Sequence, residues 1–305
     1  MVHVKIFIST FAFSNELNMK FGKFKRSAEA GSEDNEMTFW DHLEDLRGSL
    51  FRSIVAIVVF GITAFIFKGF IFDQVILAPK NNDFITFRLL CKLGKMLSID
   101  SFCFKTASIN LINIELAGQF MSHLMISIIV GLVVAIPYII WELWRFVKPG
   151  LTENEIKNTR GVVFIISALF LTGVLFSYFL VVPLMINFLG NYQVSAVVIN
   201  QIALTSYTSS VTMMTLIMGL IFEFPVLVVF LTKIGIVSPS LLKKYRKHTV
   251  VAILIIAGLI TPSPDIFSQL VVAIPLYGLY EISLSVSSRM YRKKEKMEEL
   301  EELAG

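Results

Sequence analysis

The feature that most constrains this chain is a long stretch without charge. No Asp, Glu, Lys or Arg occurs from Gly161 to Phe222, and this stretch is far longer than the roughly 20 residues that one membrane-spanning helix needs. The whole chain is 55% hydrophobic and only 16% charged, whereas soluble domains carry about 25% charged residues. The chain is therefore predicted to be a membrane protein.

Six apolar segments are candidates for membrane spans. Only helices and closed barrels satisfy their backbone in a water-free bilayer core, and these segments are too long and too uniformly apolar for barrel strands. The predicted fold class is an all-α polytopic membrane protein with six transmembrane helices, of which the fifth and sixth are short. The expected spans are Leu50–Phe67, Leu116–Ile140, Gly161–Val182, Tyr207–Leu231, His248–Ile260 and Ile266–Val286.

Basic residues mark one side of the predicted membrane domain. Lys and Arg cluster in the loops Trp141–Arg160 and Lys233–Lys247 and in the tail, whereas the loops Pro183–Ser206 and Thr261–Asp265 hold none. Short loops rich in Lys and Arg stay in the cytoplasm. We therefore expect a multi-pass protein of the cell inner membrane with both termini in the cytoplasm.

The chain is expected to have three parts. Residues 1–36 form a variable, disordered extension, 37–288 form the six-span membrane domain, and 289–305 form a charged cytoplasmic tail. The polar composition of Gly22–Glu36 is typical of disordered segments. We expect the functional chain to begin at one of the later methionines, Met19 or Met37.

Signatures of soluble enzymes are missing from the sequence. There is no phosphate-binding glycine loop, no zinc-protease helix and no nucleophile elbow, and the four histidines and two cysteines lack metal-ligand spacing. For His123, in the middle of a span, helix packing is favoured over ligation. We expect no enzyme activity, no cofactor, no metal and no nucleic-acid partner.

Two acidic features lie beside the predicted spans. Phe39, Leu43, Leu46 and Leu50 follow helical spacing, which predicts an amphipathic helix leading into the first span. Its acidic face could bind a cationic peptide or could simply be a solvated polar face. The second feature is Glu155, before the third span, which forms a capping-box pattern with Thr152 and is otherwise a candidate ligand.

A third acidic feature lies inside the predicted bilayer. Glu223 interrupts the apolar fourth span, where an ionisable group costs at least ~2.5 kcal/mol. It is a functional-site candidate that should face other helices or a wet cavity. Glu281 in the sixth span is a weaker companion, because it lies nearer the cytoplasmic end and could reach the interface.

The motifs of the chain, taken in order, resemble those of the TatC family, the largest subunit of the twin-arginine translocase. The resemblance covers Phe39 to about Arg289. Among the motifs that carry it are Phe39-Trp40-Asp41-His42-Leu43-Glu44-Asp45-Leu46-Arg47, Ala78-Pro79, Ala135-Ile136-Pro137, Trp144-Arg145-Phe146, Pro149-Gly150-Leu151, Phe222-Glu223-Phe224-Pro225, Thr261-Pro262-Ser263-Pro264-Asp265 and Ala273-Ile274-Pro275.

The resemblance implies a signal-peptide receptor and core subunit that exports folded proteins. It would use the proton-motive force and small single-span partners of the TatA and TatB type, and it would self-associate. The family's carboxylates that hold the arginine pair fall on Asp45 and Glu155, with Glu44, His42 and Arg47 as further candidates. Its partner-helix contacts fall on Glu223, Thr261 and Gln269. The alternative is a proton-coupled secondary transporter of a small solute.

The predicted loop after the first span contains both cysteines of the chain. Cys91 and Cys103 could pair in an oxidising periplasm, and the closed loop would then be worth about 3 kcal/mol in the chain-entropy estimate. Two free thiols are the other possibility.

Overall fold

The computed structural model describes residues 39–81, 83–97, 110–148, 161–195, 197, 200–261 and 266–304. The chain divides into two compact units, Met1–Glu44 and Asp45–Gly305. In the first unit only residues 39–44 are described, and they belong to a helix. The expected N-terminal extension and both later candidate start methionines lie outside the described residues.

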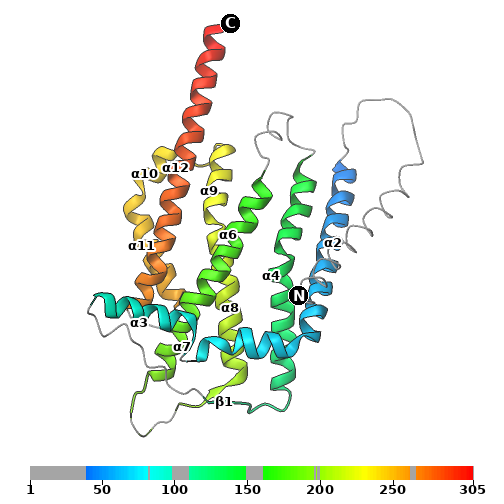
Figure 1. The fold of residues 1–305 in the computed structure, drawn as a ribbon. Coiled ribbons are helices and arrows are strands. Elements are labelled where there is room, and N and C mark those ends of the chain that lie inside the picture. Colours follow the sequence, from blue (N-terminus) through cyan, green and yellow to red (C-terminus); the bar gives the residue numbers. More distant parts are fainter. Residues whose placement is uncertain are drawn as a thin grey trace, which may run out of the picture. The chain divides into compact units, whose positions relative to one another are not determined.

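The structure is built from helices (Figure 1). In chain order the helical elements are α2 (Phe39–Ile66), η1 (Phe70–Ile76), η2 (Ala78–Lys80), α3 (Ile85–Leu97), α4 (Gly118–Val147), α6 (Val162–Phe176), η5 (Ser177–Val181), α7 (Val182–Asn191), α8 (Leu204–Phe222), α9 (Phe224–Lys233), α10 (Pro239–Lys244), α11 (Arg246–Ile260) and α12 (Ile266–Ala304).

Five helical stretches of the described chain are long and apolar enough to cross a membrane. They are Leu43–Ile66, Gly118–Val147, Val162–Asn191, Leu204–Lys233 and Gln269–Arg292. The third joins α6, η5 and α7, and the fourth joins α8 and α9. The chain is thus a helical multi-pass membrane protein, as its sequence predicts.

The last two predicted spans differ in length. The fifth corresponds to α11, a helix of 15 residues, which covers about 22 Å against a hydrocarbon core of about 30 Å. The sixth corresponds to α12, which continues past Val286 to Ala304 as one helix. The predicted tail 289–305 is therefore helical as far as Ala304.

Glycines bring neighbouring helices into close contact. A Cβ on Gly131 of α4 would lie 2.6 Å from the backbone nitrogen of Gly61 in α2. A Cβ on Gly173 of α6 would lie 2.7 Å from the carbonyl oxygen of Met218 in α8, and one on Gly219 would lie 2.7 Å from the Phe170 ring. Small residues allow the backbones to approach this closely. The resulting van der Waals packing drives helix association in lipid, where no hydrophobic effect acts between helices.

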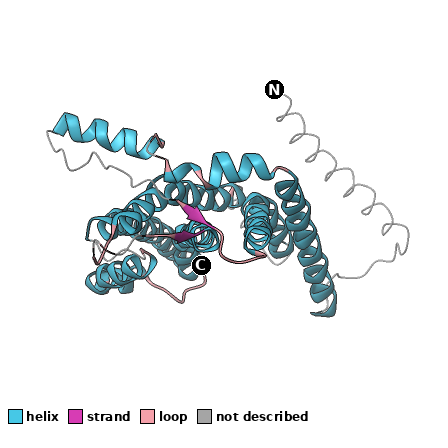
Figure 2. Ribbon diagram, turned by 90° about the horizontal axis from the view of Figure 1, so that it is seen from below, coloured by secondary structure: helices cyan, strands magenta, loops and turns pink. Residues whose placement is uncertain are grey.

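The two ends of the bundle are built differently. At one end, called the C-terminal end here, α4 ends at Val147, α6 begins at Val162 and α9 ends at Lys233, and α12 extends beyond the bundle (Figure 1). At the opposite end the chain between α2 and α4 forms η1, η2, α3 and a short strand. This strand, β1 (Leu111–Ile112), pairs in parallel with β2 (Ile202–Ala203) (Figure 2).

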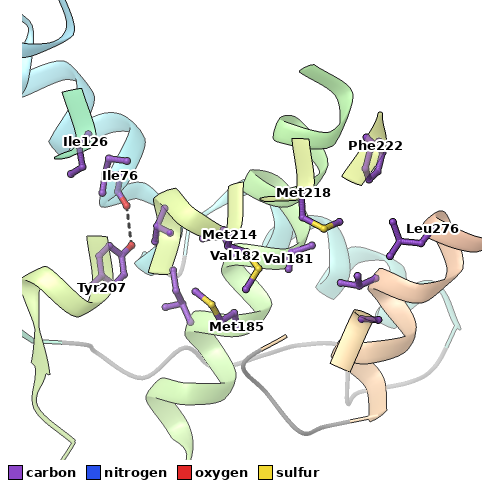
Figure 3. Close-up of a cluster of buried hydrophobic side chains, with 14 of the residues drawn as sticks. Ile76, Ile126, Val181, Val182, Met185, Tyr207, Met214, Met218, Phe222 and Leu276 are labelled. Carbon is purple, nitrogen blue, oxygen red and sulfur yellow. Dashed lines mark hydrogen bonds between the residues drawn. The ribbon is translucent and has the colours of Figure 1, made fainter. Parts of the chain in front are cut away.

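A buried apolar cluster holds these elements together. It includes Val181 and Met185 of the third span, Met214 and Met218 of α8, and Leu276 of α12 (Figure 3). At its edge the buried hydroxyl of Tyr207 donates a 2.9 Å hydrogen bond to the carbonyl oxygen of Ile76. The η1 segment is thereby fixed to α8.

Candidate functional site

The predicted peptide-binding residues of the amino-terminal motif lie on α2. Helix α2 runs from Phe39 to Ile66 without a break, which confirms that the motif is helical and continuous with the first span. Glu44, Asp45 and Arg47 are exposed. His42 belongs to the helix, but its side chain lies outside the described part of the structure.

A buried ion pair lies at the C-terminal end of the bundle, between α2 and α4. The Nη2 atom of Arg52 donates to Oε2 of Glu142 at 2.9 Å, and the hydroxyl of Tyr138 donates to Oε1 at 2.8 Å. The Glu142 side chain is 0% exposed and that of Arg52 is 37% exposed. Both carboxylate oxygens of Glu142 therefore accept a hydrogen bond although no part of this side chain reaches solvent.

Asp45 belongs to the same face of α2 as this ion pair. Asp45, Ser49 and Arg52 follow the i, i+4, i+7 spacing that places side chains on one face of a helix. Arg52 also donates to the Ser49 hydroxyl at 3.0 Å. The exposed carboxylate of Asp45 thus continues a polar row, Asp45, Ser49 and Arg52, toward the buried carboxylate of Glu142.

Sequence reasoning missed the Arg52–Glu142 pair. The second span was expected to end at Ile140, which left Glu142 in a loop, whereas α4 continues to Val147. Arg52 is the only charged residue of the expected span Leu50–Phe67. A lone charge at such a position calls for a partner, and this signal could have prompted a search for the opposite charge.

Glu223 lies at the junction of α8 and α9. It is the last residue before Phe224-Pro225, and Pro225 has no N–H to continue the helical ladder. Both oxygens of its carboxylate are buried without a hydrogen-bond partner in the described structure. A polar group left this way is costly unless another group satisfies it.

Thr261 and Gln269 lie at the junction of α11 and α12. The buried Thr261 hydroxyl donates to the carbonyl oxygen of Ala257 at 2.8 Å, and the Gln269 amide donates to that of Leu254 at 2.8 Å. A Cβ on Gly258 would lie 3.2 Å from the Gln269 nitrogen, so this glycine admits the amide. Both predicted partner-contact residues therefore hydrogen-bond to α11 and not to Glu223.

The two weaker candidates have structural contacts. Glu281 pairs with Arg246 and accepts a 2.7 Å hydrogen bond from the Tyr277 hydroxyl, in a partly exposed cluster that ties α11 to α12. His123 stacks on Phe65 with 3.9 Å between ring centroids, and its Nε2 lies 3.1 Å from the Phe65 carbonyl oxygen. The helix-packing interpretation of His123 is confirmed.

Two predicted site residues lie in segments that the structure does not describe. Glu155 lies in the segment 149–160 and Cys103 in 98–109, both outside the described residues. Cys91 lies in α3 and is disulfide-bonded. Among the residues that are described, no three His, Cys, Asp or Glu side chains group together as metal ligands would.

These features define a class of protein. It is a multi-pass helical membrane protein with a polar row at one end of the bundle and an unsatisfied carboxylate within an apolar helix. Residues 41–275 match the family model described as Sec-independent protein translocase protein (TatC). The chain belongs to the TatC family. Members of this family are translocase components and not enzymes, which confirms the prediction on activity and removes the small-solute transporter.

Relatives match over most of their length. The chain is 41% identical over 265 residues to the Sec-independent protein translocase protein TatC of Blattabacterium sp. subsp. Periplaneta americana, a match that covers 86% of this chain and 99% of the relative. It is 33% identical over 262 residues to TatCy of Bacillus subtilis, covering 86% and 93%. A crystal structure of the twin-arginine translocase receptor TatC in DDM is 28% identical, with a TM-score of 0.60, and covers 81% of this chain and 99% of that one.

Proposed function

We propose that this chain is the signal-peptide receptor and core subunit of a twin-arginine translocase, and that it exports folded proteins across the inner membrane. The observation that carries the proposal is the polar row of α2, Asp45, Ser49 and Arg52, next to the buried Glu142 of α4. Helix α4 ends at Val147, at the same end of the bundle, and the second proposed ligand, Glu155, follows it in the sequence.

The chemistry of the ligand fits these residues. A guanidinium presents its donors in a planar fork that matches a carboxylate, and lysine does not reproduce that geometry. Within the protein itself, Arg52 and Glu142 are joined by one bond of this kind, from Nη2 to Oε2, while the other carboxylate oxygen accepts from Tyr138. Asp45 is exposed, so its carboxylate is accessible to an arginine arriving from water. We assign the two arginines of the signal to Asp45 and Glu155, with Glu44, His42 and Arg47 nearby.

The proposed topology places both termini and this polar row in the cytoplasm. Lys233 at the end of α9, Lys243 and Lys244 of α10, and Arg246 lie at the C-terminal end of the bundle, where basic residues are retained. In the same topology α11 crosses the membrane as the fifth of six spans, a short helix among longer neighbours. The first inter-span loop is then exported, where an oxidising compartment favours disulfides, and Cys103 is the proposed partner of Cys91.

The proposed contacts with partner subunits lie on polar residues of the apolar helices. Glu223 offers two buried acceptors that receive no hydrogen bond from the residues that the structure describes, and polar groups of this kind favour association between helices in membranes. A single-span subunit of the TatA or TatB type that carries a polar side chain would satisfy the carboxylate. Thr261 and Gln269 would supply a second polar contact, and the proton-motive force would supply the energy.

The receptor assignment is tested by photo-cross-linking a precursor to the full chain in membrane vesicles. The probe is placed beside the arginine pair of the signal. We expect Asp45→Asn and Glu155→Gln each to remove the cross-link while the protein still inserts at normal levels. Asp73→Asn in η1 is the matched control, because Asp73 is exposed and belongs to the opposite end of the bundle. Equal cross-linking in all three variants, or with a twin-lysine signal, would refute the assignment.

A further inference from the structure

Helix α3 (Ile85–Leu97) has an amphipathic pattern that the receptor function does not use. Its sequence, ITFRLLCKLGKML, contains three basic residues and no acidic residue. Arg88, Lys92 and Lys95 follow the i, i+4, i+7 spacing of one helical face. The helix therefore presents a stripe of positive charge that nothing within its own sequence neutralises.

One side of α3 is anchored to the third span. Phe84, just before the helix, stacks on Phe179 with 5.9 Å between ring centroids and meets Tyr178 edge-on at 5.7 Å. The Thr86 hydroxyl donates to the carbonyl oxygen of Phe179. Thr86 and Phe87 are buried, at 5% and 3% exposure. These contacts hold the helix so that it runs across the direction of the spans (Figure 1).

The anchor point lies near the level of a membrane surface. Val162, which follows Arg160 and Gly161, begins the charge-free third span. At 1.5 Å per residue Phe179 lies about 25 Å further along the helix, and the hydrocarbon core is about 30 Å thick. A helix fixed to Phe179 and running across the span is thus close to the boundary between acyl chains and headgroups.

The outward side of α3 mixes apolar and basic side chains. Ile85, Leu89 and Met96 are 54%, 57% and 76% exposed, and Arg88, Lys92 and Lys95 are exposed as well. An open hollow on this side is lined by Ile85, Arg88, Leu89 and Lys92. Apolar side chains that enter the acyl boundary beside cations that meet phosphates are the pattern of an interfacial helix.

We propose that α3 is a binding site for anionic phospholipids in the leaflet at this end of the bundle. Ile85, Leu89 and Met96 enter the acyl boundary, and Arg88, Lys92 and Lys95 bind headgroup phosphates. The absence of any Asp or Glu in the helix favours an anionic lipid over a zwitterionic one. The disulfide bond of Cys91 limits the freedom of the helix, which reduces the entropic cost of binding.

The test uses the full chain in nanodiscs of phosphatidylcholine with increasing fractions of phosphatidylglycerol. Backbone hydrogen exchange in 85–97 reports the binding. We expect exchange to slow as phosphatidylglycerol increases, and the lipid fraction needed for half of this protection to rise about fivefold for each basic residue replaced by Gln, since each contributes about 1 kcal/mol near an anionic surface. High salt should weaken the protection.

Controls separate the site from general charge effects. Lys243→Gln with Lys244→Gln, in α10, removes positive charge at the C-terminal end of the bundle and should leave exchange in 85–97 unchanged. Arg88→Gln, Lys92→Gln and Lys95→Gln should retain the disulfide and the melting temperature of the parent. Exchange in 85–97 that is the same with and without phosphatidylglycerol would overturn the proposal. Protection that appears only when an acidic partner protein is added would overturn it as well. Precursor cross-linking is measured separately and does not decide this result.

Discussion

Glu142 and Glu223 are both glutamates within long apolar helices, but their surroundings are opposite. Glu142 is fully buried and both of its oxygens accept hydrogen bonds, one from Arg52 and one from Tyr138. Glu223 has two buried oxygens and no donor in the described structure. The first carboxylate is satisfied within the chain and joins two helices, whereas the second has no donor among the described residues and is open to a group from another subunit.

This difference predicts different effects of mutating the two residues, one on stability and the other on assembly. Removing a satisfied buried carboxylate leaves its cation without a partner, and the free energy of unfolding falls. Removing an unsatisfied carboxylate takes away an unfavourable group, so folding should tolerate the change while association suffers. The comparison is therefore tested by measuring the free energy of unfolding and the binding of partner subunits in variants of each glutamate.

The largest effect is expected for Glu142→Ala. It should lower the free energy of unfolding by about 2–3 kcal/mol, less than the 3–5 kcal/mol of a fully buried pair because Arg52 keeps access to solvent. Thermal or denaturant unfolding of the protein in detergent measures this loss. The double variant Arg52→Met with Glu142→Leu should recover most of it. Additive losses in that double variant would show that the two residues are not coupled.

A somewhat smaller effect is expected for Gly131→Ala. The new Cβ would lie within 3 Å of the Gly61 backbone, so α2 and α4 must separate at a cost of about 1–3 kcal/mol, and the Arg52–Glu142 contact should loosen with them. Gly278→Ala in α12 is the matched control, because a Cβ there meets nothing within 4 Å. It should be neutral or stabilising by up to ~1 kcal/mol. Equal melting temperatures in the two variants would contradict the close crossing.

Glu223→Ala should affect assembly rather than folding. We expect its free energy of unfolding to fall by at least ~1 kcal/mol less than that of Glu142→Ala, since it breaks no hydrogen bond. Partner binding should weaken about three- to twentyfold, as expected for loss of a polar contact of 0.6–1.7 kcal/mol between membrane helices. Precursor cross-linking should persist while export falls. Normal export by this variant would remove the proposed role of Glu223.

The smallest effect is expected for Thr261→Val. Its hydroxyl bonds the Ala257 carbonyl oxygen, but the Thr261 backbone N–H bonds the same oxygen at 2.9 Å. That acceptor stays satisfied, and the cost should remain below about 0.5 kcal/mol. A large fall in melting temperature would indicate a contact beyond α11, whereas lost partner binding at normal stability would support the proposed contact role.

Much of the fold could be predicted because the local composition of a segment is enough to indicate whether it spans a membrane. The charge-free run from Gly161 to Phe222 indicates apolar helices, and the spacing of Phe39, Leu43 and Leu46 indicates a helix that continues into the first span. The end of α4 was harder to predict. Polar and aromatic residues after Ile140 resemble an interface, but Tyr138 and Arg52 make it favourable to keep Glu142 within the helix.

The sequence by itself determined that the chain crosses a membrane several times and that Glu223 is costly where it lies. It also located the motifs of the TatC family. Only the tertiary structure decided which charges are paired, because Arg52 and Glu142 are far apart in sequence and meet only when α2 packs against α4. Gly61 and Gly131 allow these two helices to approach closely further along their length. It also decided that α3 is anchored beside Phe179 with its basic side exposed. Hydropathy and periodicity report one element at a time, whereas pairing depends on contact between elements.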